Sequence, residues 1–316
     1  MLVAPDKFKG TMTAAEVAAA IASGLRAAGR RTEELPVADG GEGTADALLR
    51  ALGGEWVVAA ASDALGRPIQ ARFAMLADHR AVVEAAEASG LARIPERERD
   101  AWAASTRGTG ELIAAAADAG ASEVIVAVGG TAATDGGAGA LAALGEARID
   151  PRLTVVCDVR TPFEHAARVF APQKGAGPET VKRLARRLTA FASKAPRDPR
   201  GIPMTGAGGG LAGGLYAHRG AKLVPGAPFV LDALGFDERM RAAAFVVTGE
   251  GRLDEQTLEG KAAGEVAVRC RQAGVACHAI VGQLAIDDFS IRVLALDGLL
   301  EVGDPKALAS AGVELA

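Results

Sequence analysis

Short apolar runs that end in polar, glycine-rich segments recur along the chain. Leu2–Pro5, Leu35–Ala38, Val124–Val128 and Phe245–Thr248 each have the composition of a short buried strand, and acidic residues and glycines follow every one of them. Ligands in open α/β sheets bind just beyond the carboxyl ends of strands. Glycines in such loops let the backbone approach a ligand closely. These segments therefore suggest phosphate and metal chemistry.

Helical spacing alternates with these runs at the start of the chain. Ala14–Ala28 carries apolar residues at helical intervals, with Thr13 as the expected N-cap and Gly29 as the stop. A second helix is expected over Thr44–Leu52. Alternation of strand and helix predicts a parallel sheet.

The pattern then changes to hairpin spacing and later returns. Trp56–Ser62, Ile69–Leu76 and Ala81–Ala85 resemble three strands joined by short turns, which favours antiparallel pairing. We therefore expect a Rossmann-like doubly wound parallel sheet domain, residues 1–55 and 229–316, with a second α/β domain of mixed sheet, residues 56–228, inserted into it. Other expected elements are the helices Thr109–Ala119, Ala138–Leu144, Pro178–Ala192 and Gly264–Ala273 and the strands Thr154–Cys157, His278–Val281 and Leu299–Val302.

Composition narrows the class of protein. The 316 residues exceed the usual size of a single core, and 49% hydrophobic with 23% charged residues is ordinary for a globular protein. A net charge of -4 without a long basic run argues against a nucleic-acid partner. No apolar stretch is long enough and charge-free enough to suggest a membrane partner. With no signal-peptide pattern and three cysteines, an odd number, a cytoplasmic location is expected.

Several familiar motifs are missing or ambiguous. The chain has no Walker A sequence, no Gly-x-Ser-x-Gly elbow and no histidine spacing typical of a metal site. One Gly-x-Gly-x-x-Gly occurs at Gly208–Gly213. It is either a phosphate-binding turn at a helix N-terminus or a tight helix contact made by small residues, and the sequence favours neither.

The acidic residues each allow two interpretations. Asp39 and Glu42 either cap the following helix or hold a ligand, and Asp135 raises the same choice; two such glycine-framed acids at strand ends favour metal or substrate contacts. Asp158, at the end of a predicted strand, is either a site residue or a residue of the following turn. Lys174 is either a cation that binds a ligand beside a glycine or a solvated residue at the start of a helix.

Taken together, the motifs of the chain resemble those of one family, the type 1 glycerate kinases. The matching strings run in family order from residue 2 to about Gly282. They are Ala4–Gly10, Ala38–Thr44, Thr106–Ile113, Gly129–Gly139, Cys157–Val159, Ala171–Ala176, Gly206–Gly214, Thr248–Thr257 and Gly260–Ala262.

The resemblance implies an enzyme that phosphorylates D-glycerate from ATP with Mg²⁺ to give 2-phosphoglycerate, built as two α/β domains around a cleft. It leaves a homodimer open. The chain departs from the family pattern in being shorter between Gly145 and Leu153 and after Gly282, where the usual closing helix is not evident.

Phosphoryl transfer needs alignment, charge neutralisation and a group that accepts the hydroxyl proton. Asp158 is the first candidate for the proton acceptor and Asp135 the second, with Lys174 as a catalytic cation. The remaining expected roles are substrate binding by Asp6, Lys9, Gly40 and Gly41; nucleotide binding by Gly206, Gly208, Gly209, Gly210, Glu250, Asp254 and Lys261; and Mg²⁺ ligation by Asp39, Glu42 and Asp135.

Two other functions stay open. The chain could be a kinase for another small hydroxy acid, because specificity depends on pocket shape. A regulatory protein that has lost activity is the other alternative, although no motif carboxylate is missing.

Overall fold

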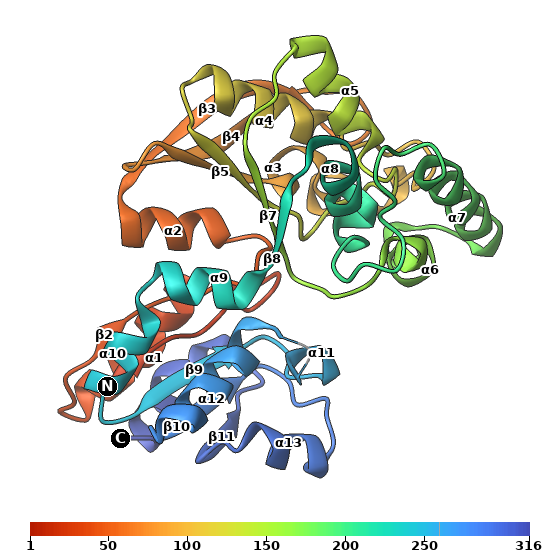
Figure 1. Ribbon diagram of the computed structural model, residues 1–316. Helices are drawn as coiled ribbons and strands as arrows, with labels where there is room; N and C mark the ends of the chain where they lie inside the picture. Colours follow the sequence, from red (N-terminus) through yellow and green to blue (C-terminus); the bar gives the residue numbers. More distant parts are fainter. Residues whose placement is uncertain (259) are drawn as a thin grey trace. The chain divides into compact units, whose positions relative to one another are not determined.

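The computed structural model describes residues 1–258 and 260–316, and the chain forms two compact units. Unit 1 comprises Met1–Asp39 and Gly226–Ala316, and unit 2, Gly40–Pro225, is inserted between these segments (Figure 1). The domain division expected at residues 55 and 228 stays a prediction. The compact units differ from it chiefly in grouping helix α2, Thr44–Leu52, with unit 2.

Unit 1 is a five-stranded parallel sheet with helices on both faces. Its strand order is β11-β10-β9-β1-β2, so the chain runs outward from β1 in one direction and from β9 in the other. The strands are β1 (Leu2–Val3), β2 (Glu33–Glu34), β9 (Val246–Glu250), β10 (Cys277–Val281) and β11 (Gly298–Glu301). The helices are α1 (Ala14–Ala27), α9 (Gly226–Ala233), α10 (Phe236–Ala242), α11 (Glu255–Leu258), α12 (Ala262–Ala273), α13 (Asp288–Leu294) and α14 (Leu308–Glu314), with the short 3₁₀ helix η6 (Pro305–Ala307).

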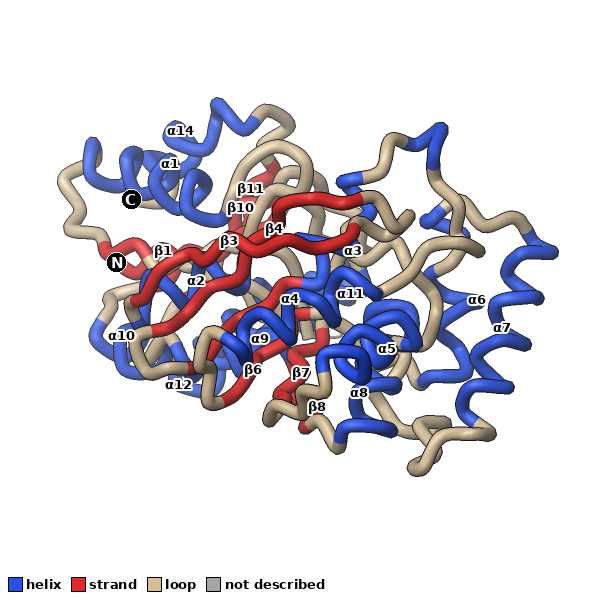
Figure 2. The backbone as a smooth tube through the Cα atoms, turned by 90° about the horizontal axis from the view of Figure 1, so that it is seen from above, coloured by secondary structure: helices blue, strands red, loops and turns tan. Residues whose placement is uncertain are grey.

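The helices α1 and α14 pack together on one face of this sheet, and α10 and α12 lie on the other (Figure 2). The N-cap of α1 is confirmed: the Thr13 hydroxyl accepts from Glu16 N while Glu16 accepts from Thr13 N. The expected lack of a closing helix is wrong, because α14 closes the chain. Its backbone lies so close to α1 that a Cβ on Gly24 would meet Ala309 O at 1.9 Å.

One strand of unit 1 is shorter and earlier than expected. The sequence predicts a strand over Leu35–Ala38, whereas the strand is β2 at Glu33–Glu34. Leu35 N still donates to Val3 O and Val37 N to Pro5 O, so the segment continues alongside β1. Pro36 lacks an N–H and cannot extend a regular ladder.

Unit 2 contains a six-stranded mixed sheet in the order β3-β4-β5-β6-β7-β8. The first three strands pair antiparallel, as the hairpin spacing predicts, and β5 to β8 pair in parallel. The strands are β3 (Gly54–Ser62), β4 (Pro68–Leu76), β5 (Arg80–Glu84), β6 (Glu123–Ala127), β7 (Leu153–Cys157) and β8 (Lys222–Pro225). The fold class expected from the sequence, a Rossmann-like doubly wound sheet with an inserted α/β domain, is confirmed.

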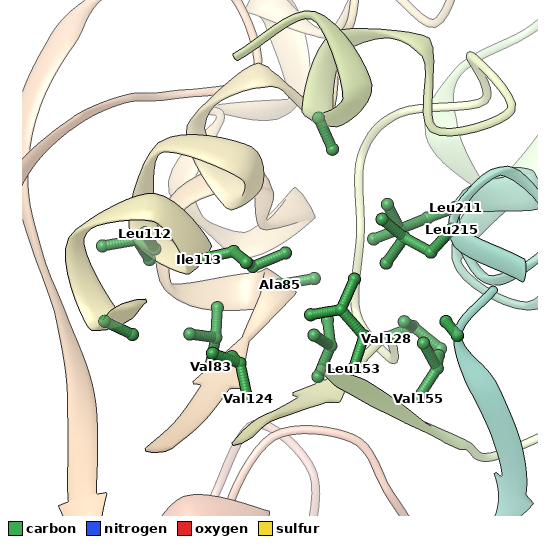
Figure 3. Close-up of a cluster of buried hydrophobic side chains, with 14 of the residues drawn as sticks. Val83, Ala85, Leu112, Ile113, Val124, Val128, Leu153, Val155, Leu211 and Leu215 are labelled. Carbon is green, nitrogen blue, oxygen red and sulfur yellow. The ribbon is translucent and has the colours of Figure 1, made fainter. Parts of the chain in front are cut away.

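Helices cover this sheet and supply its core. Besides α2 they are α3 (Ala85–Ser89), α4 (Arg107–Asp118), α5 (Ala138–Ala147), α6 (Ala166–Phe170), α7 (Pro178–Ala192) and α8 (Leu211–Arg219). Short 3₁₀ helices are η1 (Leu91–Arg93), η2 (Glu96–Glu98), η3 (Phe163–His165), η4 (Pro172–Lys174) and η5 (Ala207–Gly210). Figure 3 shows leucine and isoleucine side chains of α4 and α8 against valines of β5, β6 and β7. This aliphatic packing fixes the strand ends that carry the candidate site.

Candidate active site

The carboxyl ends of β6 and β7 hold the first group of candidate residues. Asp158 directly follows β7, and Gly129 lies two residues beyond β6. The Gly129 N–H donates to Gly40 O at 3.5 Å. A Cβ atom on Gly129 would lie 2.6 Å from Gly41 Cα and 3.1 Å from Asp158 Oδ2. A glycine at residue 129 thus allows Gly40, Gly41 and Asp158 to meet at one edge of the unit 2 sheet.

Lys174 is a buried cation in the same unit. Its side chain ends 2.5 Å from Ala133 O and 3.4 Å from Thr131 Oγ1, and the residue is 3% exposed. Burial lowers the pKa of Lys174 to about 8, against the attraction of Asp135 and Asp158, which raises it. The alternative of a solvated helix start is excluded, because the amine is enclosed and electrostatically coupled to two candidate carboxylates.

Asp135 is bound by the chain around it. Its carboxylate accepts from Thr106 N at 2.9 Å, Gly137 N at 3.0 Å and Gly139 N at 3.1 Å, and from the Thr106 hydroxyl. These donors belong to the N-terminal ends of α4 and α5, where a carboxylate is stabilising. The arrangement favours the capping alternative for Asp135 over proton transfer or metal ligation.

The glycine-rich turn Gly206–Gly210 is tightly packed. Three of its glycines have positive φ angles of 62°, 67° and 89°. A Cβ on Gly209 would lie 2.1 Å from Ala133 O, and one on Gly210 would lie 2.8 Å from the Phe163 ring. These contacts favour the packing alternative, in which small residues let η5 and α8 lie against their neighbours.

Sequence reasoning missed one residue at this edge, Glu84. It is the last residue of β5, is 5% exposed, and accepts from Gly43 N at 3.0 Å and Ala45 N at 2.8 Å. Its position at a strand end is the same signal that points to Asp158. Residue 84, however, lies outside the motifs that carry the family resemblance, and alanines follow it.

The predicted metal ligands are divided between the two compact units. Asp39 belongs to unit 1, where its Oδ1 lies 3.9 Å from Lys7 Nζ, whereas Glu42 is exposed in unit 2. Among the described residues, no three His, Cys, Asp or Glu side chains converge closely enough to hold a metal ion. Any Mg²⁺ bound by these carboxylates would need other ligands, as Mg²⁺ commonly takes from phosphates and water.

Unit 1 has its own candidate group, where the strand order reverses. Asp6 follows β1 and Glu250 ends the adjacent parallel strand β9. The space between two such strands is the ligand position expected for a doubly wound sheet. Burial raises the pKa of Asp6 to about 6, aided by Asp39 and opposed by Lys7. Burial also raises the pKa of Glu250 to about 7.

The neighbours of Glu250 form a short network. The Thr257 hydroxyl donates to Glu250 Oε1 at 2.6 Å, and Lys261 Nζ lies 3.7 Å from Glu250 Oε2 and 2.9 Å from Asp254 Oδ1. The sequence-predicted residues Glu250, Asp254 and Lys261 are thus brought together. Lys9 is exposed on the loop after β1.

Comparison with known proteins shows to which family this chain belongs. The model of the glycerate kinase family matches residues 1–153 and 146–307. A glycerate kinase from Halalkalibacterium halodurans is 37% identical over 96% of this chain and 94% of its own length. The chain belongs to the glycerate kinase family.

Two further relatives with glycerate kinase names are similar to this chain over nearly its whole length. Glycerate 2-kinase of Escherichia coli K12 is 34% identical, covering 96% of this chain and 90% of its own length. A crystal structure from Salmonella typhimurium LT2 that carries the provisional name glycerate kinase 2 is 32% identical, with a TM-score of 0.83 over 99% of this chain and 96% of its own. The resemblance drawn from the motifs, and the expectation of an enzyme of this family, are confirmed. No described helix of the chain has the length and apolar character required to cross a membrane.

Proposed function

We propose that the protein transfers the γ-phosphoryl group of ATP to a hydroxyl of D-glycerate, with Mg²⁺, to give 2-phosphoglycerate. The observation that carries this proposal is the group formed by Asp158, Lys174 and the Gly40–Gly41 backbone in unit 2 of a chain from the glycerate kinase family. A carboxylate, a buried cation and glycines at strand ends meet three needs of phosphoryl transfer: a proton acceptor, charge neutralisation and close approach.

In this proposal the chain's own groups divide the work. Asp158 accepts the proton of the attacking hydroxyl. Lys174, which lies near Asp158 and is fixed by Ala133 O, stabilises negative charge on the phosphoryl oxygens. The backbone at Gly40 and Gly41 binds the small anionic substrate. Asp135 supports the site by holding the N-termini of α4 and α5.

Nucleotide and metal binding complete the proposal. We assign Glu250, Asp254 and Lys261 to nucleotide binding, because they converge where ligands bind a doubly wound sheet. We assign no nucleotide contact to the glycines of the turn before α8, because they are tightly packed against neighbouring chain segments. These glycines are Gly206, Gly208, Gly209 and Gly210. Oxygen donors suited to Mg²⁺ are present at Asp39 and Glu42, and the bound ion would neutralise phosphate charge.

We also propose a cellular location and an oligomeric state for the enzyme. The three cysteines, Cys157, Cys270 and Cys277, are buried and free of disulfides, which is compatible with the cytoplasm. A homodimer is one arrangement to test by light scattering.

A coupled ADP-release assay tests the activity. Purified protein with ATP and Mg²⁺ should release ADP when D-glycerate is added, and product analysis should find the phosphate on the 2-hydroxyl. L-Glycerate and related hydroxy acids serve as competitors for the specificity claim. A folded protein without glycerate-dependent turnover contradicts the proposal, and faster turnover of another hydroxy acid favours that alternative substrate.

A further inference from the structure

The loop Gly40–Gly43 lies along the carboxyl ends of adjacent strands of unit 2. Gly40 O accepts from Gly129 N beyond β6, and Gly41 lies against Gly129 beside Asp158 at the end of β7. At its other end, the loop meets the last residue of β5, Glu84. The strands β5, β6 and β7 are neighbours in the sheet, so the loop follows one continuous edge.

Glu84 supplies a helix cap that the loop itself cannot. The N-cap residue of α2 is Gly43, which has φ of +95° and no side chain to accept a hydrogen bond. The Glu84 carboxylate takes that role from another strand, because its Oε1 accepts from both Gly43 N and Ala45 N. Without Glu84, two backbone donors next to the glycine loop would lose a charged acceptor.

The loop backbone also accepts hydrogen bonds from the helix that follows it, from Thr44 N to Gly41 O and from Ala47 N to Gly43 O. The Thr44 hydroxyl donates to Gly41 O at 2.7 Å, and Gly40 and Gly43 both adopt positive φ. Glycines have wide conformational freedom, so their position depends on what holds the ends of the segment. The restraint at Gly129 acts on one end and the restraint at Glu84 acts on the other.

We propose that Glu84 is a positioning residue for substrate binding, holding the Gly40–Gly43 loop in the conformation that accepts the substrate carboxylate. This inference rests on the proposed function, in which Gly40 and Gly41 bind glycerate. Glu84 does not touch substrate in this account. It acts through the two backbone amides that it binds.

The test compares Glu84→Ala and Glu84→Gln with Glu111→Ala. Glu111 is a matched control because its carboxylate also accepts a backbone hydrogen bond in unit 2, from Ser62 N at 2.6 Å, and its hydrogen-bond partners, Ser62 and Arg107, are not loop residues. Glu84→Ala should raise the KM for glycerate about tenfold or more, the size expected for losing a charged acceptor. The KM for ATP should change less than about threefold, since the loop carries no nucleotide contact in the proposal.

Rescue and loop order provide independent readouts. Glu84→Gln keeps a carbonyl acceptor and should restore most of the glycerate affinity. Amide hydrogen exchange in the peptide spanning residues 40–52 should accelerate in Glu84→Ala and stay unchanged in Glu111→Ala. All variants are measured below the onset of thermal unfolding.

Each outcome decides a different claim. Equal glycerate KM and equal exchange for Glu84→Ala and Glu111→Ala overturn the positioning role. Failure of Glu84→Gln to rescue also overturns it, because acceptor geometry would then not be what matters. If the wild-type protein does not turn over glycerate, the proposed function fails, and faster exchange in Glu84→Ala still supports loop positioning.

Discussion

At the residue scale, hydrogen-bond partners distinguish the two carboxylates that the sequence offers as proton acceptors. Asp135 accepts hydrogen bonds from three backbone N–H groups and from the Thr106 and Ser105 hydroxyls, which together fix its position. Asp158 is half-buried at a strand end, near Lys174 and the glycine backbone. These surroundings support the proposal that Asp158 accepts the proton and that Asp135 caps helices.

Asp158→Asn tests this assignment. The substitution keeps the size of the side chain but removes its ability to accept a proton at neutral pH, so kcat should fall by about 10²–10⁴-fold. Nucleotide affinity and the melting temperature should change little. Retention of more than about a tenth of the wild-type kcat would rule out Asp158 as the base and return Asp135 to first place.

Glu250 predicts a pH dependence of stability. Its folded-state pKa of about 7 lies above the ordinary value of 4.5, because burial disfavours the charged carboxylate. Between these values the folded chain binds more protons than the unfolded chain, so the contribution of Glu250 is present below pH 4.5 and is lost as pH rises through 7.

Glu250→Gln should remove this dependence, because glutamine resembles the protonated acid and can still accept from Thr257. At pH 8 the variant should be more stable to urea than the wild type by up to about 3 kcal/mol, with nearly equal stability at pH 4.5. Its affinity for ATP should fall if Glu250 binds the nucleotide. Identical pH slopes for the two proteins between pH 5 and 8 would refute the buried charge.

At the element scale, close approach of backbones decides where the chain requires glycine. The turn before α8 packs against the loop after β6 so tightly that Gly209 has no room for a Cβ, and its φ of +67° also disfavours other residues. By contrast, Gly145 in α5 has open space around its missing Cβ. Glycine content alone does not separate these two cases.

Gly209→Ala and Gly145→Ala therefore form a matched pair. Gly209→Ala should destabilise the protein by about 3 kcal/mol or more, combining backbone strain with a clash against Ala133 O. Gly145→Ala should be neutral or stabilise it by about 0.5–1 kcal/mol, because alanine favours a helix interior. Chemical denaturation of both variants checks the contrast, and a mild effect at residue 209 would show that the turn can shift.

At the scale of the whole molecule, two compact units each present a candidate group at the carboxyl ends of parallel strands. Unit 1 gathers Asp6, Glu250, Asp254 and Lys261, and unit 2 gathers Gly40, Gly41, Asp158 and Lys174. The chain passes between the units after Asp39 and after Pro225. The motif Ala38–Thr44 is therefore divided, with Asp39 in one unit and Glu42 in the other.

A chelator should separate catalysis from folding. Because the described residues hold no group of three acidic, histidine or cysteine ligands, Mg²⁺ is expected to enter with the nucleotide and not to support the fold. EDTA should abolish ADP release and leave the melting temperature of the nucleotide-free protein within about 1 °C, since a ligand stabilises only when it binds the folded state. A large drop in melting temperature would reveal a structural metal.

The family, the fold class and several helices and strands could be predicted from the linear sequence. Helical periodicity predicted the bounds of α2 and α7 correctly at both ends. The change to hairpin spacing near Trp56 predicted the antiparallel strands of the mixed sheet. These features depend on local spacing, so a linear pattern contains them. The motif order likewise identified the glycerate kinase family before any contact was known.

The surroundings of each charged group depend on the three-dimensional fold. Asp135 and Asp158 are both candidate acids in the sequence, and the fold brings the N-termini of α4 and α5 to Asp135. Lys174 is a buried cation because distant segments enclose it, and Glu84 reaches α2 across 41 residues of chain. Burial and hydrogen bonding between remote segments follow from packing in three dimensions, which residue spacing along one chain does not encode.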